Sequence, residues 1–239
     1  MMSRVFVCLL LSFTTLLPVM AQSSRGLPTA TEVTRPSEGD NDPLLYLELI
    51  LNMQEKGLYF ASLAHLDAFD QRWPNHPRAA VLRGDALRET GYYERAAAVY
   101  RALLKGEQSF AAHHGLGIIA ARQGNRPEAI AQLLRANALA PTQVAVLNDL
   151  GYLQLLDMQL EDARMNLQKA AELDQKNQKV AANLVLLFLL EGKPEKAAGL
   201  IKWYQLPEAQ CQQLERKAQE LKESARLTRQ EQQARGKAQ

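Results

Sequence analysis

Two adjacent histidines, His113 and His114, are the first candidates for chemistry in this chain of 239 residues. Imidazole is a common metal ligand and general base, so the pair invites comparison with a metal site. Neighbouring residues of a helix point about 100° apart, which makes the pair a poor bidentate ligand set. His65 and His76 lie elsewhere, and no cysteine or acidic cluster accompanies the pair. We therefore expect no catalytic residues and no metal site, while a metal-dependent hydrolase using the His113–His114 region stays open as an alternative.

A second candidate is the stretch Gly115-Leu-Gly117-Ile-Ile-Ala120, which has the GxGxxA spacing of a dinucleotide-binding loop. That motif binds phosphate only at a turn between a strand and a helix. Here the stretch lies inside a predicted helix, and no strand pattern precedes it. The sequence also has no GxSxG nucleophile motif and no HExxH motif. We expect a protein that is not an enzyme and needs no cofactor.

The composition excludes several other classes. With 47% hydrophobic and 23% charged residues, the chain is neither collagen-like, nor of low complexity, nor wholly disordered. A net charge of +2, from 28 basic and 26 acidic residues, gives no electrostatic basis for binding nucleic acid or an anionic membrane. The C-terminal basic residues alternate with Glu and Gln and lack aromatic residues for base stacking. We expect no nucleic-acid partner, and membrane contact only through a partner protein.

Residues 1–21 have the pattern of a secretory signal peptide. Arg4 supplies the positive charge, Val5 to Leu17 form a mostly apolar run, and Pro18 breaks it. Val19-Met20-Ala21 suits cleavage after Ala21. An uncleaved anchor is the alternative, although a spanning helix needs about 20 apolar residues. The sequence thus predicts an exported protein, most simply a periplasmic one.

Residues 22–42 and the cysteines refine this prediction. The segment 22–42 is rich in Pro, Gly and polar residues, so we expect a disordered leader. Cys8 leaves with the signal peptide, and the remaining Cys211 cannot form an internal disulfide. A lipoprotein would need a cysteine directly after the cleavage point, where Gln22 stands. Lipoprotein anchoring is therefore not supported.

The middle of the chain repeats itself with a period of 33 to 34 residues. Each copy has a turn glycine, then a small residue five positions later, then a large apolar or aromatic residue four positions after that. A fifth copy has Met158 in place of the glycine and keeps the other two positions as Ala163 and Leu167. The four glycine copies are Gly57/Ser62/Leu66, Gly91/Ala96/Tyr100, Gly124/Ala129/Leu133 and Gly192/Ala197/Ile201. A period of this length is typical of a stacked helical repeat protein.

The period and the pattern resemble the tetratricopeptide repeat (TPR). Leu116-Gly117 and Leu150-Gly151 match its Leu-Gly pair, and Pro74 and Pro141 match its terminal proline. The resemblance implies an all-α TPR solenoid of about five helix-turn-helix units, at 43–76, 77–109, 110–143, 144–177 and 178–206. Glycine and alanine are expected where the two helices of a unit cross closely, because a larger side chain would force them apart.

The segment 207–239 is predicted to be a C-terminal capping helix and polar tail. Leu214, Ala218, Leu221 and Ala225 form one apolar row on a helix whose other faces are charged. We expect the row to cover the fifth unit, and the helix to fray by about Thr228.

The TPR resemblance places the binding surface in a concave groove, lined by positions 2, 5, 9 and 12 of each unit's first helix. The groove residues expected on this basis are Arg78, Asp85, Arg88, His114, Ile118, Asn148, Tyr152, Leu155 and Leu186. Asn148 and Tyr152 are polar groups on an otherwise apolar stretch, which suits an extended or helical peptide with hydrophobic anchors. The leucines could instead be covered by neighbouring units or by the capping helix. The carboxylate-clamp set of chaperone-tail-binding TPRs is not present.

Short exported TPR chains are similar to the TadD family of tight-adherence (Flp) pilus assembly proteins and to TPR pilotins of outer-membrane secretins. This resemblance implies a scaffold that assists pilus or secretin assembly by holding a protein or peptide segment in its groove. An adaptor for periplasmic enzymes of cell-envelope synthesis is the alternative scaffold.

Overall fold

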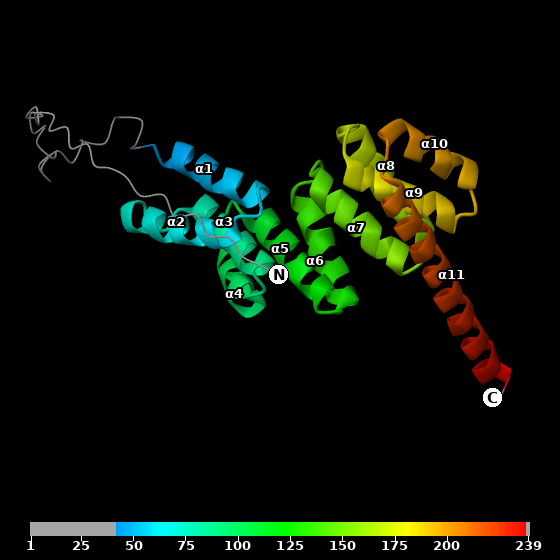
Figure 1. The fold of residues 1–239 in the computed structure, drawn as a ribbon. Coiled ribbons are helices and arrows are strands. Elements are labelled where there is room, and N and C mark those ends of the chain that lie inside the picture. The colour runs from blue at the N-terminus through cyan, green and yellow to red at the C-terminus, as the bar shows by residue number, and fades with distance from the viewer. Residues whose placement is uncertain (1–41, 238–239) are drawn as a thin grey trace, which may run out of the picture. The chain divides into compact units, whose positions relative to one another are not determined.

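The computed structural model describes residues 42–237, and the regular structure of this part of the chain is entirely α-helical. The predicted all-α class is therefore confirmed, while the predicted signal peptide at 1–21 and the leader up to residue 41 lie outside the described residues. The helices are α1 (Pro43–Glu55), α2 (Tyr59–Arg72), α3 (Pro77–Glu89), α4 (Tyr93–Leu103), α5 (Ser109–Arg122), α6 (Arg126–Leu139), α7 (Val144–Leu156), α8 (Leu160–Leu173), α9 (Gln178–Leu190), α10 (Pro194–Tyr204) and α11 (Glu208–Lys237) (Figure 1).

The turn between the two helices of each unit contains a residue with positive φ. Glycine occupies this position after α1, α3, α5 and α9, with φ between 72° and 85°. Met158 occupies this position after α7 with a φ of 56°, a backbone conformation that residues other than glycine rarely adopt. The five copies of the sequence pattern therefore share one backbone turn, including the copy that lacks the glycine.

Within the units, glycine on the first helix allows close contact with a large side chain of the second. A Cβ atom added at Gly117 would lie 2.9 Å from Leu133, and one added at Gly151 would lie 2.7 Å from Leu167. These distances are shorter than van der Waals contact, so a larger residue would push the two helices apart. The small residues that the sequence pattern singled out are thus those on which the helix pairs close.

Tyr100 of α4 packs against glycines of two successive units. Its ring is fully buried and lies against Gly84 of α3 and Gly115 of α5, where an added Cβ atom would collide with it. Gly115, which resembled part of a nucleotide-binding loop, therefore accommodates an aromatic ring inside a helical stack.

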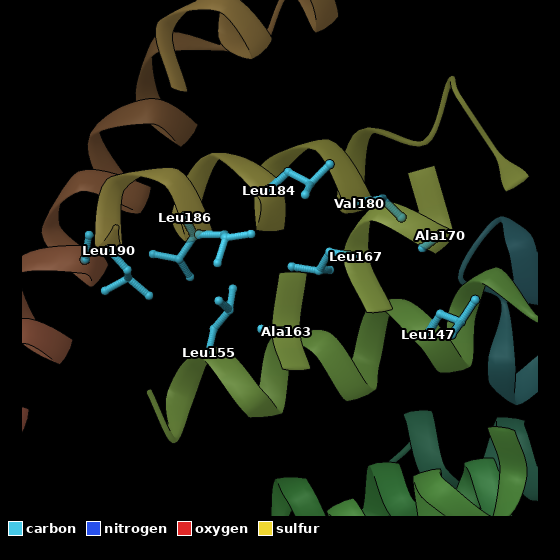
Figure 2. Packing of buried hydrophobic residues seen from close by; sticks show 11 residues of the cluster. Leu147, Leu155, Ala163, Leu167, Ala170, Val180, Leu184, Leu186 and Leu190 are labelled. Atoms are coloured by element: carbon cyan, nitrogen blue, oxygen red, sulfur yellow. The ribbon is translucent and has the colours of Figure 1, made fainter. Parts of the chain in front are cut away.

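The largest core cluster joins α7, α8, α9 and α11 (Figure 2). Leu155 lies in this cluster at 0% exposure, close to Leu186 and Leu190, and Ala218 of α11 belongs to the same cluster. The expectation that Leu155 faces the groove is therefore wrong, because its side chain is buried in the cluster that α7 forms with α8 and α9.

Helix α11 packs on α9 as the predicted cap, but it does not fray at Thr228. It continues to Lys237, and its side chains from Leu227 to Arg235 are exposed. Lys222 donates from its ammonium group to the backbone oxygen of Leu189, at 2.6 Å. No helix within residues 42–237 combines the length and the hydropathy that crossing a membrane would need.

Replacing Gly151 by alanine tests the close helix crossing. The new methyl group would overlap Leu167, so we expect the free energy of unfolding to fall by about 1–3 kcal/mol. Gly199 on α10 is the matched control, because no atom lies within 4 Å of a Cβ atom added there. There alanine should raise the free energy of unfolding by about 0.5–1 kcal/mol. Urea unfolding measures both, and changes of the same sign would contradict the packing described.

Candidate protein-binding groove

A cavity of about 870 Å³ lies where α3, α5, α7 and the start of α9 meet. Its floor is apolar, and its rim carries charged and amide side chains. The lining residues are Arg88, Glu89, His114, Gly117, Ile118, Ala121, Arg122, Leu133, Val144, Ala145, Asn148, Asn177, Asp149, Tyr152, Leu153, Leu156 and Lys179. A volume of this size is within the range of about 300–1,000 Å³ typical of ligand sites.

The cavity exists because α5 and α7 stay apart. Among the described helices, the first helix of each unit approaches the first helix of the next closely for the pairs α1–α3, α3–α5 and α7–α9, but not for α5–α7. The second helix of the third unit, α6, packs on α7 and joins the third unit to the fourth. The space left between α5 and α7 ends at Gly117 and at Leu133, a core residue that is 1% exposed.

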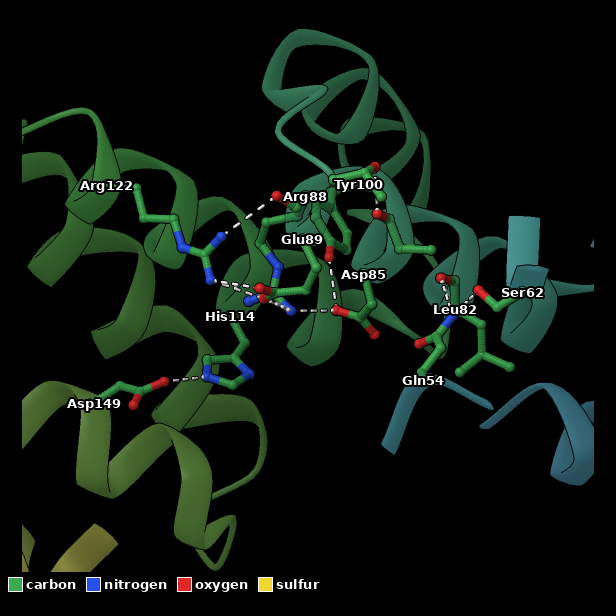
Figure 3. A network of polar contacts seen from close by, with 12 residues as sticks. Gln54, Ser62, Leu82, Asp85, Arg88, Glu89, Tyr100, His114, Arg122 and Asp149 are labelled. Atoms are coloured by element: carbon green, nitrogen blue, oxygen red, sulfur yellow. Dashed lines mark hydrogen bonds and ion pairs between the residues drawn. The ribbon is translucent and has the colours of Figure 1, made fainter. Parts of the chain in front are cut away.

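The α3 side of the rim is a network of ion pairs (Figure 3). One terminal nitrogen of Arg122 donates to both carboxylate oxygens of Glu89, at 2.7 and 2.9 Å. Arg88 contacts the carboxylates of Asp85 at 3.0 Å and of Glu89 at 3.3 Å. The hydrogen bonds that Arg122 donates to the Glu89 carboxylate raise the pKa of Arg122. Both arginine charges of this network are therefore already balanced by protein carboxylates.

Tyr100 connects this network to the core. Its hydroxyl donates to the carboxylate of Asp85 at 2.8 Å, and Asp85 in turn accepts from Arg88. Burial, together with the charge of Asp85, raises the pKa of Tyr100 above its usual range. The ring packed between two glycines thus also orients the arginine at the rim.

A second polar series runs across the first helices of the later units. His114 of α5 and Asp149 of α7 are joined by a hydrogen bond of 2.8 Å between Nε2 and Oδ2 (Figure 3). Asn148 donates to Asp149 at 3.2 Å and accepts from Asn183 of α9 at 2.8 Å. Because the unit length is 34 residues here, each link between units joins a residue to one 35 positions later. The His114–Asp149 bond spans the opening between α5 and α7.

A second cavity of about 490 Å³ continues the groove toward α11. It shares Asn148, Asp149, Tyr152 and Lys179 with the first cavity. The C-terminal helix supplies one wall of it. The additional lining residues are Ala182, Asn183, Leu186, Gln210, Gln213, Leu214 and Lys217.

The structure brings most of the predicted groove residues together. Arg88, His114, Ile118, Asn148 and Tyr152 line the first cavity. The remaining predicted residues are placed differently, as follows. Leu186 borders the second cavity but is 1% exposed, and Leu155 is in the core. Asp85 lines neither cavity and forms an ion pair with Arg88. Arg78 is exposed and also lines neither cavity.

The two adjacent histidines serve different contacts. His113 bonds through Nδ1 to Oε1 of Gln132 at 2.6 Å, inside its own unit, whereas His114 faces Asp149 across the groove. In residues 42–237, no group of three or more His, Cys, Asp or Glu side chains is arranged to hold a metal ion.

Four residues of the site were not predicted from the sequence: Asp149, Asn183, Glu89 and Arg122. A signal for them was present, because polar residues at position 5 of one unit and position 6 of the next recur 35 residues apart. Glu89 and Arg122 likewise occupy the same position of the second and third units, 33 residues apart.

Comparison with known proteins agrees with this architecture. No protein-family model matches the sequence. The TPR repeat-containing protein PA4299 of Pseudomonas aeruginosa is 36% identical over 169 residues, which is 68% of this chain. The chain spans 64% of that relative, less than two thirds of its length. A TPR protein of Thermus thermophilus, TTC0263, superposes with a TM-score of 0.60 at 17% identity, covering 75% of this chain and 98% of the other.

The chain therefore has the fold of a TPR repeat protein. PilF of Pseudomonas aeruginosa also shares this TPR fold, with a TM-score of 0.59 at 20% identity over 76% of this chain and 84% of PilF.

The buried hydroxyl of Tyr100 predicts a pH dependence of stability. As the pH rises through about 10, the phenol ionises in the unfolded chain, whereas the folded protein keeps it protonated. The unfolded state then binds fewer protons, so the free energy of unfolding falls with increasing pH, by up to about 1.4 kcal/mol per unit.

Tyr100→Phe removes this contribution and the hydrogen bond to Asp85. At pH 7 we expect the variant to be less stable by about 0.5–1.5 kcal/mol, and we expect this difference to shrink above pH 10. The other tyrosines are common to both proteins, so urea unfolding from pH 8 to 11 isolates Tyr100. Parallel pH curves for the two proteins would contradict the assignment.

Proposed function

We propose that this TPR protein is a scaffold that binds a segment of a partner protein in the groove formed by α3, α5, α7, α9 and α11. The observation that carries the proposal is the cavity between α5 and α7, whose apolar floor lies beneath a rim of amide and charged groups. An apolar floor can bury side chains of the partner, since removing them from water is favourable. The amide groups can both donate to and accept from a peptide backbone.

The amide groups are held ready for such contacts. Asn183 donates to Asn148, and Asn148 in turn donates to Asp149, which restricts the rotamers of both amides before a partner arrives. Gln210 and Gln213 of α11 line the same second cavity. Groups that are already ordered lose less entropy on binding, so this arrangement favours a specific partner.

We further propose that the protein is exported and assists the assembly of a pilus or of an outer-membrane secretin. Two features of the sequence support this proposal. Residues 1–21 have the pattern of a signal peptide, and the repeat array resembles the TadD family and the TPR pilotins. The TPR fold supports a scaffold of this kind and leaves the identity of the partner to experiment.

Replacing Tyr152 by alanine tests the groove as the binding surface. The side chain lines both cavities, so its loss should lower the affinity for a native partner at least about tenfold. Tyr92→Ala is the matched control, because Tyr92 is 45% exposed and lines neither cavity.

The measurement is a crosslinking pull-down from the native cell envelope, with the chain from Gln22 onward as bait. Capture of a secretin or of pilus-assembly proteins by the unmodified protein and by Tyr92→Ala, but not by Tyr152→Ala, would support both parts of the proposal. Capture of envelope-synthesis enzymes with the same dependence on Tyr152 would retain the groove and overturn the pilus or secretin role. Equal capture by all three proteins would overturn the groove.

A further inference from the structure

We propose that the cavity between α5 and α7 is an anchor pocket for one large apolar side chain of the bound segment, and that an acidic group close to that side chain contacts Lys179. This inference rests on the proposed function and specifies the chemistry of its ligand. The ligand is a peptide segment with a bulky aliphatic or aromatic residue and a neighbouring carboxylate.

The lining of the pocket indicates an apolar anchor. Its walls include Gly117, Ile118 and Ala121 from α5, Leu133 from α6, and Val144 and Leu156 from α7. Leu133 packs directly against Gly117 and closes the base of the pocket there, whereas Ala121 is a small, half-buried residue of the wall. A large apolar group placed there would touch the core of two units at once, and its transfer from water would favour binding.

The charges around the pocket indicate an acidic neighbour. Arg88 and Arg122 are paired with Asp85 and Glu89, and Asp149 is held by His114 and Asn148. The Lys179 ammonium group, in contrast, has no ion-pair or hydrogen-bond partner among the described residues. It lines both cavities, so it is positioned to meet a charge on any segment that passes from one to the other.

The location of Lys179 in α9 strengthens this reading. The residue lies in the first turn of the helix, after the N-cap Asn177, whose side chain accepts from the backbone amides of Lys179 and Val180. A basic residue in the first turn opposes the positive end of the helix dipole, so it does not stabilise α9. The lysine and the helix terminus together place positive potential at the junction of the two cavities, which complements a carboxylate.

The test uses a library of random 12-residue peptides displayed on phage and the full chain from Gln22. We expect the enriched sequences to share one Phe, Trp, Leu or Met and an Asp or Glu within about four residues of it. A selected peptide is then synthesised in three forms, unchanged, with the apolar residue replaced by Ala, and with the acidic residue replaced by Gln. A C-terminal amide on every peptide removes the terminal carboxylate as a second source of charge.

Two substitutions distinguish the parts of the proposal. Ala145→Trp fills the pocket from an exposed position on α7, and we expect it to weaken binding of the unchanged peptide at least tenfold. Ala198→Trp on the exposed side of α10 is the control and should leave the affinity unchanged. Lys179→Ala should bind the Glu and Gln forms equally, whereas Lys176→Ala should keep the preference for Glu.

The outcomes separate this inference from the proposed function. If a peptide binds and Tyr152→Ala abolishes binding, but Ala145→Trp and Lys179→Ala bind it as the unmodified protein does, the groove stands and the anchor pocket is overturned. If no peptide is enriched, or if binding is insensitive to Tyr152→Ala as well, both the inference and the groove are overturned. Thermal unfolding of each variant confirms that it is folded before binding is measured.

Discussion

The contact between a glycine on the first helix of a unit and a large side chain on the second is the constraint on which the rest of the structure depends. At Gly117 and Gly151 the side chains of Leu133 and Leu167 lie so close that even a methyl group would overlap them. The two helices of a unit therefore approach at these points, and their apolar residues face one another and the next unit. Tyr100 makes the same kind of contact between two units, because its ring lies against glycines of the second and the third unit.

The groove forms where the first helices of two successive units do not pack closely against each other. The first helices of successive units approach one another except at α5 and α7, where α6 joins the two units instead. The resulting cavity is lined by Gly117, Ile118 and Ala121 of α5 and is bridged by the bond between His114 and Asp149. A packed solenoid thus presents a deep apolar site beside ordered polar groups, and such a combination gives both affinity and specificity to a bound segment.

The period of 33 to 34 residues was sufficient to predict the helix pairs, their turns and the small residues at the crossings. These features are local or repeat in every unit, so one sequence can reveal them. Burial on the first helices was harder to predict. Leu155 occupies a groove position of α7 but is buried in the cluster that α7 forms with α8 and α9, so its burial depends on helices later in the chain. The tail beyond Thr228 likewise continues as a helix, although its polar sequence predicted fraying. Predicting the pairing of His114 with Asp149 requires knowing that contacts between units join residues 35 positions apart, one more than the unit length. The wide spacing of α5 and α7 has no evident signal in the sequence.

A crystal structure of the protein bound to a peptide selected by its affinity would test the central claim most directly. We expect the peptide to lie along α5, α7 and α9, with an apolar side chain between Ile118 and Val144 and with polar contacts to Asn148 and Tyr152. A peptide bound on the outer surface of the second helices, or on the exposed leucines of α1, with the space between α5 and α7 left empty, would contradict it.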